Sequence, residues 1–211
     1  MTQFKELLDK AIRLKKGEQF KPALEILENL FEKNPYSEDI KKHLINVLFD
    51  YGSHLCDDWT PKYDKASKCF KRIIDLDQNN YRAWYNLGIT HFNLNQTEQA
   101  LNSYNEALKI KPDYAYCYYN IGLVYETSKN DLEKALEYYE KALSYNANLM
   151  YALQAKRLIR QKLDISPEND LEKEQIHNET EIYHGNKKLC NNCGNYNRYD
   201  AKFCDKCGNK L

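Results

Sequence analysis

The most constraining feature of this sequence is a 34-residue segment, Tyr81 to Tyr114, because looser copies of it fill the first three quarters of the chain. Apolar and small residues recur in it at helical spacing in two runs, which a polar NLNQT stretch separates, and the second run ends at Pro112. The segment therefore predicts a hairpin of two helices with one apolar face each. The recurring residues are Trp84, Leu87, Gly88, His91, Phe92, Ala100, Leu101, Tyr104, Ala107 and Leu108.

Small residues and caps refine this hairpin. Gly88 on the first helix and Ala100 on the second are small, so we expect the two backbones to approach closely there. Thr97 is expected to cap the second helix, with Glu98 in its positive first turn.

The segment resembles the tetratricopeptide repeat, whose pattern is Trp, Leu-Gly, Tyr, then Ala, Phe, Ala and Pro. His91 and Tyr104 stand in the Tyr and Phe positions, a polar and a conservative departure. The resemblance implies an all-α, right-handed superhelical stack of hairpins, whose concave face holds an extended or helical segment of a partner protein. The residues that match directly are Trp84, Leu87, Gly88, Ala100, Ala107 and Pro112.

The chain is predicted to hold about four repeats. The second copy has a long turn containing Trp59, which either packs on Tyr63 or forms an exposed contact, and the fourth has one residue inserted before Asp131, the expected cap of its second helix. A single amphipathic helix is expected to cover the last repeat and give the stack a polar end. The predicted repeats span residues 4–37, 38–80, 81–114 and 115–149, and the capping helix 149–163.

The resemblance also implies which side chains line the groove. They alternate in helical register with the packing residues of the first helices, so they should point the other way. Tyrosine at such positions offers a large contact area at small entropy cost; the alternative is that the tyrosines cover one another between helices. The candidates are Arg82, Tyr85, Ile89, Tyr116, Tyr119 and Leu123, followed by Phe49 and Ser53.

One ligand class known for the family is not predicted here. Some members grip the terminal carboxylate of heat-shock chaperones with Lys, Asn and Arg side chains from successive repeats. Asn86 and Asn120 occupy the middle Asn position. The preceding repeats do not offer the Lys and Asn, since Leu8 and Ile12, and Phe49 and Ser53, stand there. A chaperone co-factor role is therefore not indicated.

Residues 164–187 break the repeat pattern. The segment carries seven acidic and two basic residues, a net charge of −5, and few apolar side chains. Such a composition buries too little apolar area to offset the entropy of ordering. We expect a flexible acidic linker.

The C-terminal stretch 188–211 carries the one motif with definite chemistry. It has two CxxC pairs, ten residues apart and each followed by glycine, which is the spacing that holds a tetrahedral Zn²⁺ through four thiolates. The stretch resembles the short zinc-ribbon family, with Ala201, Lys202 and Phe203 in the expected run. Two disulfides and an iron site are the alternatives. The predicted ligands of one structural zinc ion are Cys190, Cys193, Cys204 and Cys207.

Composition narrows the function classes. Lys plus Arg and Asp plus Glu are both 31, so no overall charge favours nucleic acid or an anionic membrane. No Gly-rich phosphate loop or nucleophile elbow is present. The charged start of the chain predicts neither a signal peptide nor a membrane anchor, so we expect a cytoplasmic location.

We expect a non-catalytic adaptor. The alternative is a nucleic-acid or nucleoprotein factor acting through the ribbon, whose 24 residues carry five basic and two acidic side chains.

Overall fold

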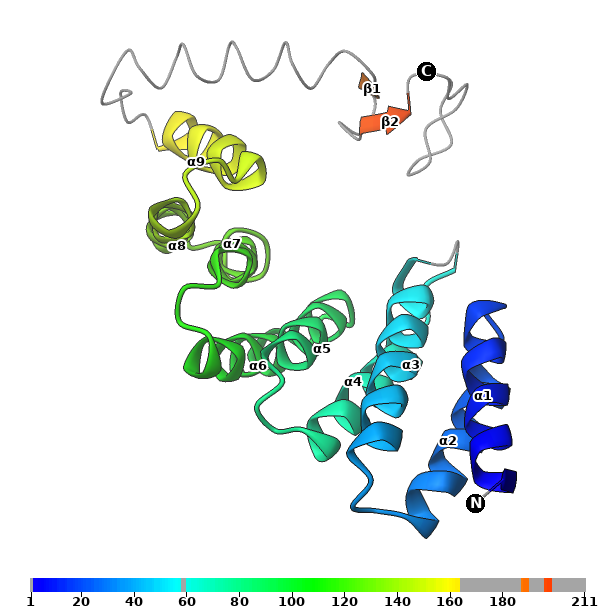
Figure 1. Ribbon diagram of the computed structural model, residues 1–211. Helices are drawn as coiled ribbons and strands as arrows, with labels where there is room; N and C mark the ends of the chain where they lie inside the picture. The colour runs from blue at the N-terminus through cyan, green and yellow to red at the C-terminus, as the bar shows by residue number, and fades with distance from the viewer. Residues whose placement is uncertain (1, 58–59, 164–186, 190–195, 199–211) are drawn as a thin grey trace. The chain divides into compact units, whose positions relative to one another are not determined.

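The computed structural model describes residues 2–57, 60–163, 187–189 and 196–198 (Figure 1). Trp59, almost all of the predicted linker and the four predicted zinc ligands lie outside the described residues. The helices up to Ile159 belong to one compact unit.

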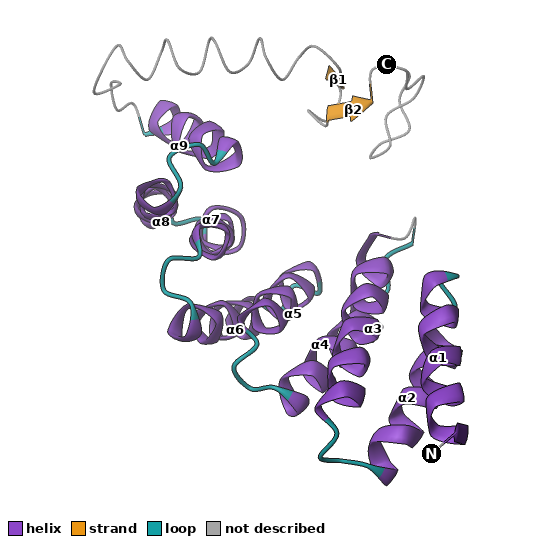
Figure 2. Ribbon diagram, viewed as in Figure 1, coloured by secondary structure: helices purple, strands orange, loops and turns teal. Residues whose placement is uncertain are grey.

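Four helical hairpins and a further helix make up that unit (Figure 2), which confirms the predicted repeat architecture. The two helices of each hairpin pack against each other, and each second helix packs on the first helix of the next hairpin. The helices are α1 (Thr2–Lys16), α2 (Phe20–Lys33), α3 (Glu38–Asp57), α4 (Tyr63–Leu76), α5 (Tyr81–Asn93), α6 (Thr97–Ile110), α7 (Ala115–Val124), α8 (Leu132–Tyr145) and α9 (Met150–Lys162).

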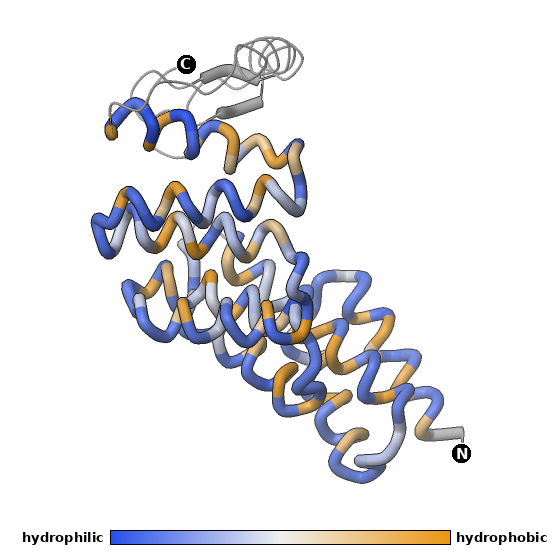
Figure 3. The backbone as a smooth tube through the Cα atoms, turned by 90° about the vertical axis from the view of Figure 1, so that its left-hand side faces the viewer, coloured by the Kyte–Doolittle hydropathy of each residue, from blue (hydrophilic) through white to orange (hydrophobic). Residues whose placement is uncertain are grey.

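Apolar residues alternate with polar ones along every helix (Figure 3), and their apolar faces form the core between hairpins. The alanines of the repeat pattern, such as Ala100, Ala107 and Ala135, are completely buried. Such small side chains let neighbouring helices approach, while a large ring fills the remaining space in each of the last three hairpins. These rings, Phe70, Tyr104 and Tyr139, are at most 1% exposed.

Each ring lies on a glycine of the opposing helix. A Cβ atom on Gly88 would lie 2.4 Å from the Tyr104 ring, and one on Gly122 would lie 2.7 Å from the Tyr139 ring. The glycine of the repeat is thus required by the aromatic ring opposite it. The sequence suggests a less specific reason, namely that Gly88 and Ala100 are both small. In the first hairpin the same two positions hold Ala11 and Leu27. Alanine is larger than the glycine of the other hairpins, and the residue opposite it is a leucine, which is smaller than their aromatic rings.

One predicted helix cap is wrong and another is confirmed. The N-cap of α6 is Gln96, which makes no side-chain capping bond, so the prediction that Thr97 caps this helix is wrong. Asp131 does cap α8 and accepts a hydrogen bond from the Lys134 amide at 3.0 Å. The inserted residue of the fourth repeat is absorbed by a π-helical turn, η1 (Tyr125–Lys129), which ends at Asn130 in the left-handed region with φ 51°.

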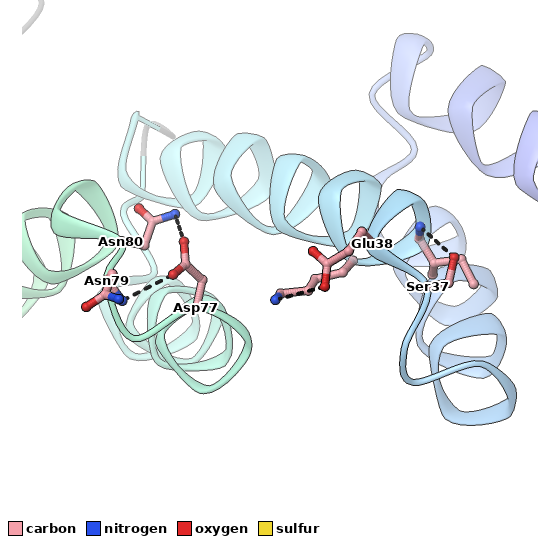
Figure 4. Close-up of polar contacts among 7 residues, drawn as sticks. Ser37, Glu38, Asp77, Asn79 and Asn80 are labelled. Atoms are coloured by element: carbon pink, nitrogen blue, oxygen red, sulfur yellow. Dashed lines mark hydrogen bonds and ion pairs between the residues drawn. The ribbon is translucent and has the colours of Figure 1, made fainter.

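The junctions between hairpins are fixed by short-range polar contacts (Figure 4). Before α5, the Asp77 carboxylate accepts hydrogen bonds from the Asn79 amide at 3.1 Å and from the Asn80 side chain at 3.3 Å. Asn80 in turn caps α5 through the Ala83 amide. The Trp84 indole donates to the Gln78 carbonyl at 3.0 Å, so the Trp position of the repeat holds the junction as well as the core.

Two short strands lie near the end of the chain. β1 (Lys187–Leu189) and β2 (Tyr196–Arg198) pair antiparallel, with Leu189 opposite Tyr196. Among the described residues, no helix combines the length and the apolar character needed to span a bilayer.

The glycine–ring contact predicts a compensating pair of substitutions. Gly88→Ala should lower the free energy of unfolding by about 1–3 kcal/mol, because the new methyl group overlaps the Tyr104 ring. Combining it with Tyr104→Leu, which reproduces the Ala11 and Leu27 pair, should cost less than the sum of the two single changes. Urea unfolding followed by circular dichroism gives the coupling energy. Strict additivity of the two changes would contradict the contact.

Candidate partner-binding groove

The first helices of the hairpins form one continuous face. In Figure 1 α3, α5 and α7 line the inner side of the curve made by the hairpins, and α4, α6 and α8 the outer side. Each first helix contacts the next through side chains of this face. These contacts are Lys15 to Asp50 at 2.8 Å, the Arg82 guanidinium 5.4 Å from the centre of the Phe49 ring, Asn120 to the Tyr85 hydroxyl at 2.8 Å, and Tyr119 to Tyr151 with ring centroids 6.0 Å apart.

The six predicted groove residues fall into two groups. Arg82 and Tyr116 are exposed, Tyr116 by 44%, and both are accessible to a ligand. The other four, Tyr85, Ile89, Tyr119 and Leu123, are half-buried.

The half-buried tyrosines hold the groove together. The Tyr85 ring contacts Tyr114 with centroids 5.0 Å apart, and its hydroxyl accepts the Asn120 hydrogen bond. Tyr119 lies between Tyr139 and Tyr151. Burial raises the pKa of Tyr85 and Tyr119, so both stay protonated at neutral pH. The alternative that tyrosines cover one another therefore holds for these two, while Tyr116 remains exposed.

Helix α9 adds to this face, although its sequence predicts only a capping helix. Lys111 directly follows α6, and its backbone amide donates to the Ala107 carbonyl. Asn146 directly follows α8, and its backbone amide donates to the Ala142 carbonyl in the same way, so the two residues are equivalent. Counting from these equivalent residues, Tyr151 corresponds to Tyr116 and Leu158 to Leu123. The counting agrees with burial, since Ala152 and Ile159 are completely buried like Cys117 and Val124. Tyr151 and Leu158 thus stand at groove positions. The same count from Asn146, made on the sequence, would have identified them.

The N-terminal half of the groove contains charged as well as apolar side chains. A cavity of about 660 Å³ is lined by residues of α1, α2 and α3, including charged side chains of both signs. His43 lies 3.6 Å from Asp39, and the His54 ring packs on Phe20 at 5.5 Å. The lining residues are Ile12, Lys15, Lys16, Glu18, Phe20, Leu27, His43, Asn46, Val47, Asp50, Ser53, His54 and Asp57.

The cysteines of the repeats lack the properties of nucleophiles. Burial raises the pKa of Cys56 and Cys69 to about 11, and the completely buried Cys117 donates its thiol hydrogen to the Tyr104 carbonyl. All three are thiols at neutral pH, and a thiol is a poor nucleophile and metal ligand. Within the described residues, no three His, Cys, Asp or Glu side chains are arranged to hold a metal ion.

Comparison with known families decides what the hairpins are. Models described as tetratricopeptide repeat match residues 69–102 and 115–149, and one described as TPR repeat matches residues 90–128. The chain carries tetratricopeptide repeats. The matched segments run from α4 to the end of α8 and its following turn.

Curated relatives share parts of these repeats. Anaphase-promoting complex subunit 3 of Schizosaccharomyces pombe is 32% identical over 100 residues, which are 46% of this chain and 15% of that protein. The uncharacterized protein ycf37 of Pyropia yezoensis is 37% identical over 102 residues, 47% of this chain and 57% of that protein. The chain thus spans less than two thirds of both relatives.

Solved structures share the fold. A crystal structure of MamA aligns with a TM-score of 0.63 at 22% identity and covers 82% of this chain and 96% of that one. The first TPR domain of Spaghetti (RPAP3), bound to the HSP90 peptide SRMEEVD, aligns with a TM-score of 0.52 at 27% identity and covers 57% of this chain and 93% of that one.

His91, which stands in the Tyr position of the third repeat, predicts acid sensitivity. The side chain is 7% exposed and its Nδ1 atom lies 3.2 Å from the Ser103 hydroxyl. Burial lowers its pKa below the ordinary 6.5, and Lys71 acts in the same direction against a backbone hydrogen bond to Gln99. The unfolded chain therefore binds the proton more readily, and the stability should fall as pH drops below about 6.5.

His91→Gln should remove this part of the pH dependence. Urea unfolding at pH 7.5 and 5.5 measures it, with His54→Gln on the exposed part of α3 as the matched control. An unchanged difference in stability between the two pH values in His91→Gln would refute the assignment.

Proposed function

We propose that this protein is a non-catalytic scaffold that binds a segment of a partner protein on the face made by α1, α3, α5, α7 and α9. The C-terminal residues 188–211 add a zinc ribbon as a second contact module. The proposal includes a cytoplasmic location, as the sequence analysis predicts.

The observation that carries the proposal is the continuous face with exposed aromatic side chains. Tyr116 is 44% exposed and Tyr151 63%, although Cys117 and Ala152 directly after them are completely buried. Exposed apolar groups gathered on one face of a packed structure are typical of interaction surfaces. That the similar RPAP3 domain binds an HSP90 peptide supports a peptide as the type of ligand.

The detailed chemistry argues against the same peptide. Leu8 is 8% exposed, so the first repeat presents a core residue where a carboxylate grip needs a lysine. Asn120 in the middle position uses its amide group on the Tyr85 hydroxyl. We therefore expect a ligand without an essential terminal carboxylate.

Photo-crosslinking tests the groove. A benzoylphenylalanine placed at Tyr116 should give covalent adducts with partner proteins in the native cell, because this side chain is exposed on the proposed face. The matched control is the same group at Asn102, which is exposed on α6, the second helix of its hairpin. Adducts of equal yield at both positions, or none at Tyr116, would contradict the groove. Alanine at Tyr85 or Tyr119 is a weaker test, since both rings support the fold.

The zinc ribbon rests on ligand chemistry and on the flanking strands. In the sequence Cys190 and Cys193 stand between β1 and β2, and Leu189 of β1 pairs with Tyr196 of β2. Four cysteines in two CxxC pairs fit a closed tetrathiolate site, which is structural rather than catalytic. Such an ion contributes on the order of 10 kcal/mol to the folding of a small module.

Metal analysis tests this part of the proposal. The full chain should contain one zinc ion per molecule by mass spectrometry, and Cys193→Ser should lose it. Cys117→Ser, which changes a buried thiol of the repeats, should retain the metal. Iron in place of zinc, or full metal content in Cys193→Ser, would be contrary to the proposal.

Nucleic acid remains the second candidate ligand of the ribbon. The five basic and two acidic residues of 188–211 give a formal +3, which a zinc tetrathiolate of charge −2 reduces to about +1. This weak charge provides little of the phosphate attraction on which nucleic-acid binding depends. A protein contact is therefore the preferred role.

A further inference from the structure

One buried phenol of the repeat core is hydrogen-bonded to a carboxylate. The Tyr139 side chain is completely buried, and its hydroxyl donates to Glu126, a residue of the π-helical turn η1, at 2.7 Å. Burial, together with this bond, raises the pKa of the Tyr139 phenol, so its proton stays on the tyrosine at neutral pH. Binding of a partner makes no use of this buried pair.

Tyr139 is also the inner end of a row of tyrosine rings. Its ring centroid lies 5.7 Å from that of Tyr119, and the Tyr119 centroid lies 6.0 Å from that of Tyr151, both distances typical of rings in contact. Tyr119 is half-buried, whereas Tyr151 is 63% exposed. We call Tyr151, Tyr119 and Tyr139 the tyrosine row. It connects the surface to the interior through ring contacts between α9, α7 and α8.

The tyrosine row has the geometry that electron transfer needs. Electron tunnelling falls steeply with the distance between donor and acceptor, so rings in contact pass an electron readily. A phenol that loses an electron becomes a strong acid, and its proton must leave with the electron. Water takes this proton at the surface, but a buried tyrosine needs a base within hydrogen-bond distance. Glu126 meets this requirement for Tyr139.

The third hairpin offers an internal comparison. Tyr104 stands at the position of Tyr139, and its ring contacts Tyr85 with centroids 6.1 Å apart. The Tyr85 ring in turn contacts Tyr114 at 5.0 Å. The partner of the Tyr85 hydroxyl is the NH₂ group of Asn120, which donates a hydrogen bond and takes up no proton. Ring contacts are thus common to both hairpins, and the carboxylate distinguishes Tyr139.

We propose that the tyrosine row transfers one-electron oxidation from the surface to the interior, with Glu126 as the proton acceptor. A one-electron oxidant in solution, such as an oxidised metal complex, first takes an electron from Tyr151, whose proton goes to water. The Tyr151 phenoxyl radical then regains a proton from water and an electron that Tyr139 supplies through Tyr119. Tyr139 becomes the phenoxyl radical, its proton passes to the Glu126 carboxylate, and Tyr119 ends unchanged.

The transfer keeps the exposed end of the row from forming covalent cross-links. Two phenoxyl radicals on exposed tyrosines of different molecules join through their ring carbons into dityrosine, and each ring releases one proton. A radical on Tyr139 cannot meet a second molecule, because this side chain is completely buried. An electron from a reductant in solution, passed along the same rings, and the proton on Glu126 restore Tyr139. This activity goes beyond the proposed scaffold function and does not depend on it.

Oxidation of the full chain by photo-generated tris(bipyridine)ruthenium(III), with persulfate as the electron acceptor, tests the inference. Tyr36, which is 95% exposed, is the internal reference. Mass mapping of peptides should find several-fold fewer dityrosine cross-links at Tyr151 than at Tyr36. Tyr139→Phe and Glu126→Gln should each raise the Tyr151 yield close to that of Tyr36, because the first removes the phenol and the second removes the base. Tyr104→Phe, the matched change in the third hairpin, should leave the yield unchanged.

Electron paramagnetic resonance of freeze-quenched samples locates the radical. The tyrosyl signal of the original chain should be lost in Tyr139→Phe and kept in Tyr104→Phe, with circular dichroism showing that both variants are folded. An equal Tyr151 yield in the original chain, Tyr139→Phe and Glu126→Gln would overturn the inference, and so would a signal that survives in Tyr139→Phe. A yield that is low in all three chains would mean that steric shielding, and not electron transfer, keeps Tyr151 from reacting. Since no partner takes part in the experiment, each of these results leaves the proposed scaffold function untouched.

Discussion

The contact of an aromatic ring with a glycine determines how close the two helices of a hairpin lie. Phe70, Tyr104 and Tyr139 each occupy the space that a Cβ atom on the opposing glycine would need. The ring buries most of its surface there, because the glycine has no side chain and the ring packs directly on the helix backbone. Because the second helix is held so closely, the other side of the first helix is left without a partner within its own hairpin. That uncovered side becomes the common face of the stack.

The contacts along this face are chemically different at each step. An ion pair links α1 to α3, a cation over a ring links α3 to α5, an amide–hydroxyl bond links α5 to α7, and two rings link α7 to α9. The repeat core depends on a shared pattern, but these cross-contacts do not. Each repeat can therefore vary its exposed chemistry without disturbing the helix packing that supports it.

Sequence reasoning predicted the hairpins and their order because small and apolar residues at fixed spacing allow little else. It also found the Asp131 cap, where an acidic residue directly precedes a helical run. It was wrong about Thr97, because Gln96 satisfies the N-cap geometry with its backbone alone. Whether a tyrosine such as Tyr85 supports a neighbour or faces a ligand depends on rings more than 20 residues away, such as Tyr114. The role of α9 was missed since Leu158 looks like an ordinary residue of a capping helix.

The change in chemistry along the first helices gives this face a direction. Arg82 over the Phe49 ring lies between a stretch of α1 and α3 that charged side chains line and a stretch of α7 and α9 where Tyr116, Tyr119 and Tyr151 stand. A bound segment that runs across both stretches would meet them in a fixed order, and the same segment reversed would place its charges against tyrosines. Under the proposed function, this face would therefore distinguish the two ends of a linear ligand in addition to its composition.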